Sequence, residues 1–206
     1  MVGRSGFGSV LLVGLSVMVT WSGVAAASPK PLPLSARLLK SGEFPRFTLE
    51  APKSFKAAKA WVAGNTSLTP AQARAQVARL SGEGFKELLA EFLDDTQGPR
   101  NGLSYVMQLG SASSARAQLA AEVRFEKAQG QAQETFRVSA IPGAVGFGSS
   151  NPNGTSGGGE NIVFADGPFF YLVGNGWSGS THNPRHAALI EAATTLYERV
   201  RGHPAA

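Results

Sequence analysis

The dipeptide Asp166-Gly167 separates two short runs of apolar and aromatic residues, and it constrains the fold of this chain more than any other feature. Asp-Gly readily adopts the positive-φ backbone that a two-residue β-hairpin turn requires. The flanking runs, residues 161–165 and 169–173, therefore predict two antiparallel strands. Pro168 stands at the start of the second strand, where its missing N–H group matters least.

A helical pattern follows this hairpin near the end of the chain. Its apolar positions recur at three- and four-residue spacing, and they are Leu189, Ala193, Leu196 and Val200. We expect Asn183 to cap the helix, Pro184 to occupy its first turn and Gly202 to end it. The apolar stripe should pack against the strand at 169–173.

Similar signals give a coarse order of elements for the rest of the chain. Thr69 and Pro70 predict the start of one helix, and Ser111 predicts the start of another that ends near Gly130. Further apolar runs predict strands at residues 46–49, 57–63, 85–93, 103–109 and 135–141. The run at 85–93 also fits a helical stripe, and this alternative stays open. Residues 142–159, rich in Gly, Ser and Asn, predict a loop.

This order of elements favours an α+β fold with an antiparallel sheet and helices packed on one face. A total of 206 residues suits a single domain, which we expect over residues 37–202. A strand, a glycine turn and a helix follow Tyr105, and a similar series follows Tyr171. The domain would then consist of two pseudo-repeated β-β-α halves, 37–130 and 131–202. Chance similarity between two such units is the alternative.

The first 27 residues indicate where the protein goes. Arg4 precedes an apolar run at residues 10–24, and Ala25-Ala26-Ala27 follows it. This is the pattern of a secretory signal peptide cleaved after Ala27; a membrane-spanning helix is the alternative, but the run is short for one. Residues 28–36 alternate prolines as an extended linker does. The chain has no cysteine, so lipid attachment to a cysteine is excluded, and we expect a secreted, extracytoplasmic protein without a stable membrane anchor after cleavage.

Three segments together carry a family resemblance: Ile141-Pro142-Gly143-Ala144, the strand ending Phe170-Tyr171-Leu172-Val173-Gly174, and the helix with Ala192-Ala193-Thr194-Thr195-Leu196-Tyr197. The chain resembles uncharacterised secreted or cell-envelope proteins of actinobacteria and similar GC-rich bacteria over about its last 70 residues. High Ala, Gly and Arg usage fits such a genome. The resemblance implies location and an α+β fold, and it brings no catalytic motif.

Several kinds of chemistry lack the pattern that they require. The net charge of +5 comes from scattered basic residues, whereas a nucleic-acid binder concentrates them on one face. The segment 154–158 matches G-x-S-x-G but lacks the strand before the serine and the helix after it. His182 and His186 are four residues apart, and no carboxylate pattern completes a metal site. Asp94-Asp95 is interpreted as a solvated turn. We therefore expect no nucleic acid, no metal and no cofactor.

The remaining site-like feature is a cluster of aromatic residues in and after the hairpin. Strand alternation places Phe169 and Tyr171 on one face and Phe170 and Leu172 on the other. One set should be core, and the other could lie exposed beside the glycine-rich loop. Phe170 and Trp177 are therefore the candidate ligand-binding residues.

These observations predict a secreted, non-enzymatic binding or interaction domain that recognises an unknown protein or a small apolar ligand. The alternative is a secreted hydrolase whose site is assembled from distant residues. Ser156 or Ser178 would act with His182 or His186 and an acidic residue. The glycine-rich loop would supply backbone N–H groups to an oxyanion.

Overall fold

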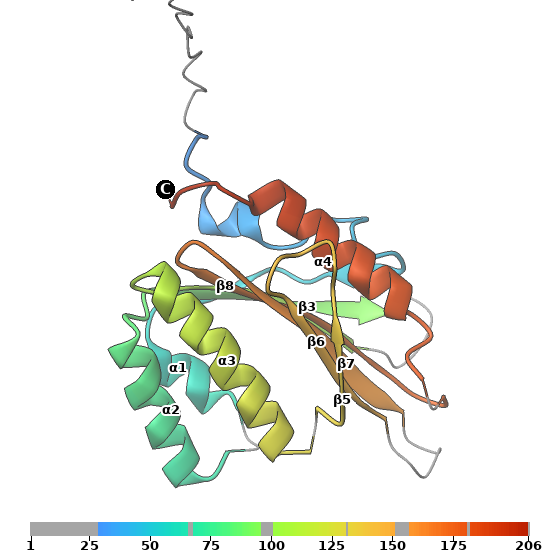
Figure 1. The fold of residues 1–206 in the computed structure, drawn as a ribbon, viewed down its shortest axis with the longest axis horizontal. Coiled ribbons are helices and arrows are strands. Elements are labelled where there is room, and N and C mark those ends of the chain that lie inside the picture. The colour runs from blue at the N-terminus through green and yellow to red at the C-terminus, as the bar shows by residue number, and fades with distance from the viewer. Residues whose placement is uncertain are drawn as a thin grey trace, which may run out of the picture.

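The computed structural model of the chain describes residues 29–65, 68–95, 101–130, 132–150, 157–180 and 182–205. Within these ranges a single eight-stranded antiparallel sheet is flanked by α-helices (Figure 1). The strands are β1 (Phe47–Leu49), β2 (Lys53–Phe55), β3 (Glu87–Asp95), β4 (Asn101–Gln108), β5 (Glu134–Arg137), β6 (Val145–Ser150), β7 (Gly158–Asp166) and β8 (Phe169–Trp177). The helices are α1 (Ala58–Ala63), α2 (Pro70–Gly82), α3 (Ala112–Ala128) and α4 (His186–Val200), and a 3-10 helix, η1, covers Leu34–Arg37.

Two hairpins form the centre of the sheet. The strand order is β1-β3-β4-β8-β7-β6-β5, with β2 also paired to β3. The expected turn at Asp166-Gly167 joins β7 to β8, with Asp166 opposite Phe169. The β3–β4 hairpin lies beside it through the β4–β8 pair, which settles residues 85–93 as mainly strand.

Helices cover both faces of this sheet. Figure 1 shows α4 on one side and α1, α2 and α3 on the other. In β8 the side chains of Phe169, Tyr171 and Val173 face α4, whereas Phe170 and Leu172 pack with residues of α1–α3. The α+β class and the antiparallel sheet are confirmed, but the helices are not confined to one face. A strand buried on both sides is apolar almost throughout, and such a run does not reveal how many faces are covered.

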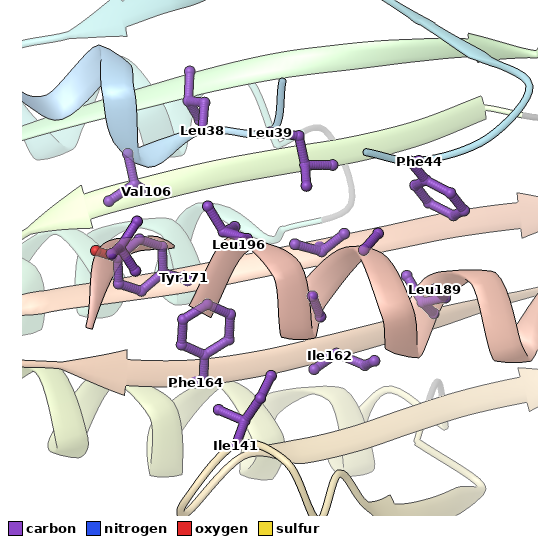
Figure 2. Packing of buried hydrophobic residues seen from close by; sticks show 14 of the residues in the cluster. Leu38, Leu39, Phe44, Val106, Ile141, Ile162, Phe164, Tyr171, Leu189 and Leu196 are labelled. Atoms are coloured by element: carbon purple, nitrogen blue, oxygen red, sulfur yellow. The ribbon is translucent and has the colours of Figure 1, made fainter. Parts of the chain in front are cut away.

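The expected packing of α4 on the hairpin is confirmed. Its four stripe residues are fully buried against β7 and β8. Figure 2 shows Leu189 and Leu196 of this helix beside Ile162, Phe164 and Tyr171, while Leu38, Leu39 and Phe44 close the cluster from the segment after η1. Each buried leucine contributes about 1.5–3 kcal/mol through removal of its apolar surface from water.

Two of the three helix caps predicted from the sequence are confirmed. Thr69 Oγ1 accepts from the Gln72 backbone while Gln72 Oε1 accepts from Thr69, which completes a capping box. Ser111 caps α3 by accepting from the Ser114 backbone at 3.1 Å. Asn183, however, is not the cap of α4, because the helix begins at His186 and its N-cap is Arg185. The Asn183 side chain contacts other partners, which are described below.

Two other local predictions were wrong. Residues 58–63 form helix α1 and not a strand, since Ala and Lys favour a helix there. The expected loop at 142–159 contains β6 and the start of β7. Gly146 and Gly158 of this segment leave room for aromatic rings from neighbouring strands, so these two glycines serve the sheet and not a loop.

The ends of the described chain lie together. Leu32 forms an isolated parallel bridge with Ala205, and η1 follows at once within the segment expected to be a linker. The expected signal peptide, residues 1–27, lies outside the described residues. None of the helices described is both long and apolar enough to cross a membrane.

The two expected halves end in the same series of three elements, although α1 and α2 of the first half have no counterpart in the second. In each, a hairpin leads into a helix, as β3-β4-α3 and as β7-β8-α4. The two helices nevertheless pack on opposite faces of the sheet.

Candidate functional site

A cavity lies between one end of strands β5–β8 and the start of α4. Its volume is about 230 Å³. Its lining combines polar, acidic and aromatic side chains with two small residues, a glycine and a serine. The lining residues are Glu134, Thr135, Phe136, Gly148, Ser149, Glu160, Trp177, His182, Asn183 and His186.

A single cross-strand row forms the floor of the cavity. Glu134 of β5 is opposite Gly148 of β6, Gly148 is opposite Glu160 of β7, and Glu160 is opposite Asn175 of β8. Gly148 therefore lies between two carboxylates and leaves the floor open, since it has no side chain. A Cβ atom at this position would lie 3.0 Å from the Gly159 carbonyl oxygen and 3.4 Å from Glu160 Cγ.

Two aromatic rings occupy the space beside glycines of the neighbouring strands. Phe136 covers Gly146, where a Cβ atom would lie 2.2 Å from the ring. Trp177 covers Gly158, where a Cβ atom would lie 2.5 Å from Cζ2 of the indole. Trp177 Nε1 also donates to the Ser180 carbonyl at 3.0 Å, which fixes the ring at the wall of the cavity.

Glu160 organises the polar groups of the wall. Its Oε1 lies 2.7 Å from His186 Nδ1, and its Oε2 accepts from the Asn183 side-chain amide. The Glu160 side chain is 10% exposed and that of His186 is 48% exposed. The Phe136 ring packs edge-on against His186 with centroids 4.8 Å apart. A carboxylate bound to Nδ1 orients an imidazole and leaves Nε2 as the ring nitrogen for other contacts.

Asn183 connects this wall to the helix and to β8. Its amide group exchanges hydrogen bonds with that of Asn175 at 3.0 and 3.2 Å, and its Oδ1 accepts from the Arg185 backbone at 2.9 Å. Asn183 therefore shapes the turn before α4 and positions the cavity wall at the same time.

The structure separates the two residues predicted as ligand contacts. Trp177 lines the cavity and is 7% exposed. Phe170 is 0% exposed and packs beside Tyr105 with ring centroids 5.8 Å apart, on the sheet face that α1–α3 cover. Phe170 is thus a core residue and offers no surface to a ligand, because its face of β8 is covered as well.

The structure brings together only part of the alternative hydrolase site. His182 and His186 both line the cavity. Ser178 is exposed beyond β8, and Ser156 lies outside the described residues. Asp94-Asp95 is not a solvated turn, since both residues belong to β3 and the Asp95 side chain is 1% exposed.

Sequence reasoning missed Glu134 and Glu160, and it considered Asn183 only as a helix cap and not as a site residue. The signal that could have revealed Glu160 was a charged residue near the start of the otherwise apolar strand β7. The residues that contact Glu160 could not be predicted from the sequence, because they depend on the register of β5, β6 and β8.

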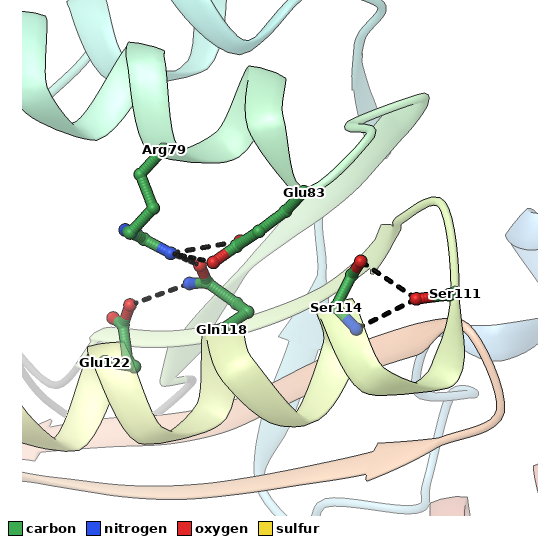
Figure 3. A network of polar contacts seen from close by, with 6 residues as sticks. All are labelled: Arg79, Glu83, Ser111, Ser114, Gln118 and Glu122. Carbon is green, nitrogen blue, oxygen red and sulfur yellow. Dashed lines mark hydrogen bonds and ion pairs between the residues drawn. The ribbon is translucent and has the colours of Figure 1, made fainter.

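A second polar cluster connects α2 to α3 (Figure 3). Arg79 donates to both carboxylate oxygens of Glu83 at 3.1 Å and to the Gln118 side chain, which in turn donates to Glu122. Burial raises the pKa of Glu122 to about 7. Because each of these residues has a hydrogen-bond partner within the cluster, we assign it the role of holding the two helices together. Across the described ranges, no group of three His, Cys, Asp or Glu side chains could hold a metal ion.

Comparison with known proteins supports the fold. No family model and no curated protein matches the sequence. Among solved structures, the chain is similar to the extracellular domain of PknH from Mycobacterium tuberculosis, with a TM-score of 0.50 and 14% identity over 81% of this chain and 94% of that one. At this identity the likeness concerns the fold alone. That domain is extracellular and comes from an actinobacterium, the group that the sequence resemblance indicated.

Proposed function

We propose that this protein is an extracytoplasmic, non-enzymatic binding domain and that the cavity beside α4 is its ligand site. The signal-peptide pattern of residues 1–27 and the extracellular nature of the similar domain support the location. The observation that carries the site is Glu160. Keeping a largely buried carboxylate costs free energy unless it is paired and hydrogen-bonded, and its pairing with His186 and Asn183 arranges three polar side chains around one cavity.

The lining favours a small polar ligand over an apolar one. A volume of about 230 Å³ lies below the range of about 300–1,000 Å³ typical of drug-sized sites. Carboxylate, imidazole, amide and hydroxyl groups converge there beside two aromatic rings. Trp177 remains a proposed ligand contact through its place in the wall.

An acid–base enzyme is the second candidate. A carboxylate that orients an imidazole through Nδ1 is the arrangement of a general base, and the Glu160–His186 pair has it at 2.7 Å. Thr135 and Ser149 bring hydroxyl groups to the lining of the same cavity. In this case His186 would activate a nucleophile for hydrolysis.

A ligand screen with a filled cavity tests the binding proposal. Backbone amide signals would be followed by NMR while a library of small polar molecules is added. Gly148→Val places a side chain on the cavity floor, and Gly159→Val is the matched control, because nothing lies within 4 Å of a Cβ atom at that position. Ligands should perturb the signals of residues around the cavity in the parent and in Gly159→Val, but not in Gly148→Val. Ligands that bind Gly148→Val as well as the parent, or a library without any cavity ligand, would refute the proposal.

Substrate assays decide between binding and hydrolysis. Generic ester and peptide substrates would be tested with the parent protein, with His186→Ala and with His203→Ala. His203 contacts the Lys30 carbonyl near the chain end and serves as the control. Turnover that disappears only in His186→Ala would favour the hydrolase. Absence of turnover together with ligand binding would favour the binding domain.

A further inference from the structure

We infer that the cavity takes a small organic ammonium ion. The inference rests on the proposed function and names the chemical class of the ligand. Its first support is charge: the lining contains Glu134 and Glu160 but no Lys or Arg. The whole chain has 19 Lys and Arg against 14 Asp and Glu. The cavity is therefore a locally acidic site on a basic protein, and an anion bound there would face two carboxylates.

The floor places these carboxylates on opposite sides of one point. Glu134 and Glu160 are the two neighbours of Gly148 in the same cross-strand row. Adjacent strands lie about 4.8 Å apart, so the two backbones are roughly 10 Å apart across the bare glycine. A small cation resting on Gly148 would have one carboxylate on each side. The gap suits an ion that carries carbon substituents better than a bare metal ion.

The aromatic rings occupy the rows before and after this one. Phe136 pairs with Gly146, and Trp177 pairs with Gly158, each two residues along a strand from the floor row. Two residues correspond to about 7 Å along a strand. Aromatic rings attract organic cations, and this attraction is stronger in sites shielded from water. Acidic side chains on two sides and rings towards the other two make a box that fits an alkylammonium group.

Other ligand classes use this lining less completely. A neutral polyol can bond to the Asn183 amide and to the imidazoles, but it gains little from two carboxylates that flank an empty floor. A metal ion needs several fixed ligands, and the described residues hold no group of three that could supply them. The lining carries two glutamates and no Lys or Arg, and a monocation balances part of the carboxylate charge.

Calorimetric titration of the protein with matched probes tests the inference. Choline and ethanolamine are the ammonium probes. The alcohol 3,3-dimethylbutan-1-ol has the shape of choline without its charge, and inorganic phosphate is the anionic probe. At least one ammonium probe should bind ten times more tightly than the neutral alcohol, and phosphate should not bind.

Variants locate the interaction. Glu134→Gln should weaken binding of the ammonium probe about five- to tenfold, and Glu160→Gln should do so at least as strongly. Glu191→Gln removes the same charge from the exposed face of α4 and should leave binding unchanged. If Glu160→Gln lowers the melting temperature, Glu134→Gln decides, because Glu134 is exposed and its loss leaves the core intact.

The outcomes separate this inference from the proposed function. Equal affinity for choline and its neutral analogue, or binding of phosphate, would overturn the ammonium inference while the cavity remains a ligand site. Ammonium binding that Glu134→Gln leaves unchanged would place it elsewhere and would also overturn the inference. A library screen without any cavity ligand would refute the proposed function itself.

Discussion

Asp95 Oδ2 and Arg185 Nη2 meet at 2.7 Å although 90 positions separate the two residues in the chain. Their side chains are only 1% and 6% exposed. Asp95 ends β3 and Arg185 precedes α4, so the pair holds the helix start against the sheet. The Arg185 guanidinium also lies 4.8 Å from the centre of the Phe47 ring. Because the Arg185 backbone donates to Asn183, the pair supports the cavity wall from behind.

Replacing one residue of this pair should lower the free energy of unfolding more than replacing both. Arg185→Met leaves the buried Asp95 carboxylate without its cation and should lower the free energy of unfolding by about 3–5 kcal/mol. Adding Asp95→Asn removes the stranded charge and should recover a large part of that loss. Urea titrations of the two single variants, the double variant and the parent measure the coupling. Strictly additive losses would show that the two side chains do not act as a pair.

The buried face of α4 should dominate its contribution to stability. Leu196→Ala should cost about 2–5 kcal/mol, because a leucine that is fully buried leaves a cavity when it is truncated. Glu198→Ala is the control on the same helix, since its side chain is 46% exposed and its ion pair with Arg201 contributes at most about 1 kcal/mol. Equal denaturation midpoints for the two variants would contradict this assignment of the helix face.

Arg37 should be among the most sensitive residues of the protein. It is fully buried, donates to Tyr171 Oη at 3.0 Å, and donates to the carbonyls of His203 and Pro204, both at 2.7 Å. Its guanidinium also lies 3.8 Å from the centre of the Phe169 ring. Arg37→Ala should lower the free energy of unfolding by about 3 kcal/mol or more, since charged hydrogen bonds contribute about 1.5–3 kcal/mol each.

Hydrogen exchange gives this prediction a local readout. Amides near residues 203–205 should exchange faster in Arg37→Ala than in the parent. Arg37→Lys is the informative comparison, because an ammonium group cannot reproduce the planar fork of the guanidinium. Unchanged exchange at the chain end in both variants would show that these carbonyls do not need Arg37.

Glu91 should make the protein less stable as the pH rises. Burial raises the pKa of this carboxyl to about 7 from an ordinary value of 4.5, and nearby Glu43 adds to the rise while Arg199 opposes it. The folded state therefore holds the Glu91 proton more tightly than the unfolded state, and its contribution to stability falls as the pH rises from about 4.5 through 7.

Glu91→Gln isolates this contribution. Between pH 5 and pH 8 the parent should lose about 1–3 kcal/mol relative to the variant, which cannot titrate at this position. Glu50→Gln is the matched control at an exposed position. Parallel stability curves for the parent and Glu91→Gln would mean that the carboxyl is not protonated in the folded protein.

Local signals predicted the elements of this fold better than their arrangement. The Asp166-Gly167 turn, the Thr69 capping box and the stripe of α4 depend on neighbours in the chain, and the structure bears them out. How many faces of the sheet are covered depends on where α1–α3 pack, which no local pattern specifies. The same limit explains the error at Phe170. The sequence correctly placed this residue in a strand, but the side chain is buried and not exposed.

The cavity depended almost wholly on register. Glu134 and Glu160 are 26 positions apart in the sequence, and only the pairing of β5, β6 and β7 places both beside Gly148. The glycines of residues 142–159 suggested a loop because glycine is common there, whereas Gly146 and Gly158 each lie under an aromatic ring. Glycine composition alone does not distinguish these two uses.

The two ends of the described chain lie together, and this determines how the molecule is oriented when it is attached through either end. Leu32 bridges Ala205, and the Gly202 amide donates to Asp166 at the turn between β7 and β8. The cavity floor lies near the opposite end of β7, a strand of nine residues and therefore about 27 Å long. A tag, a surface or a neighbouring domain joined at residue 29 or residue 205 would hold the molecule at one pole and leave the opening at the other facing the solution.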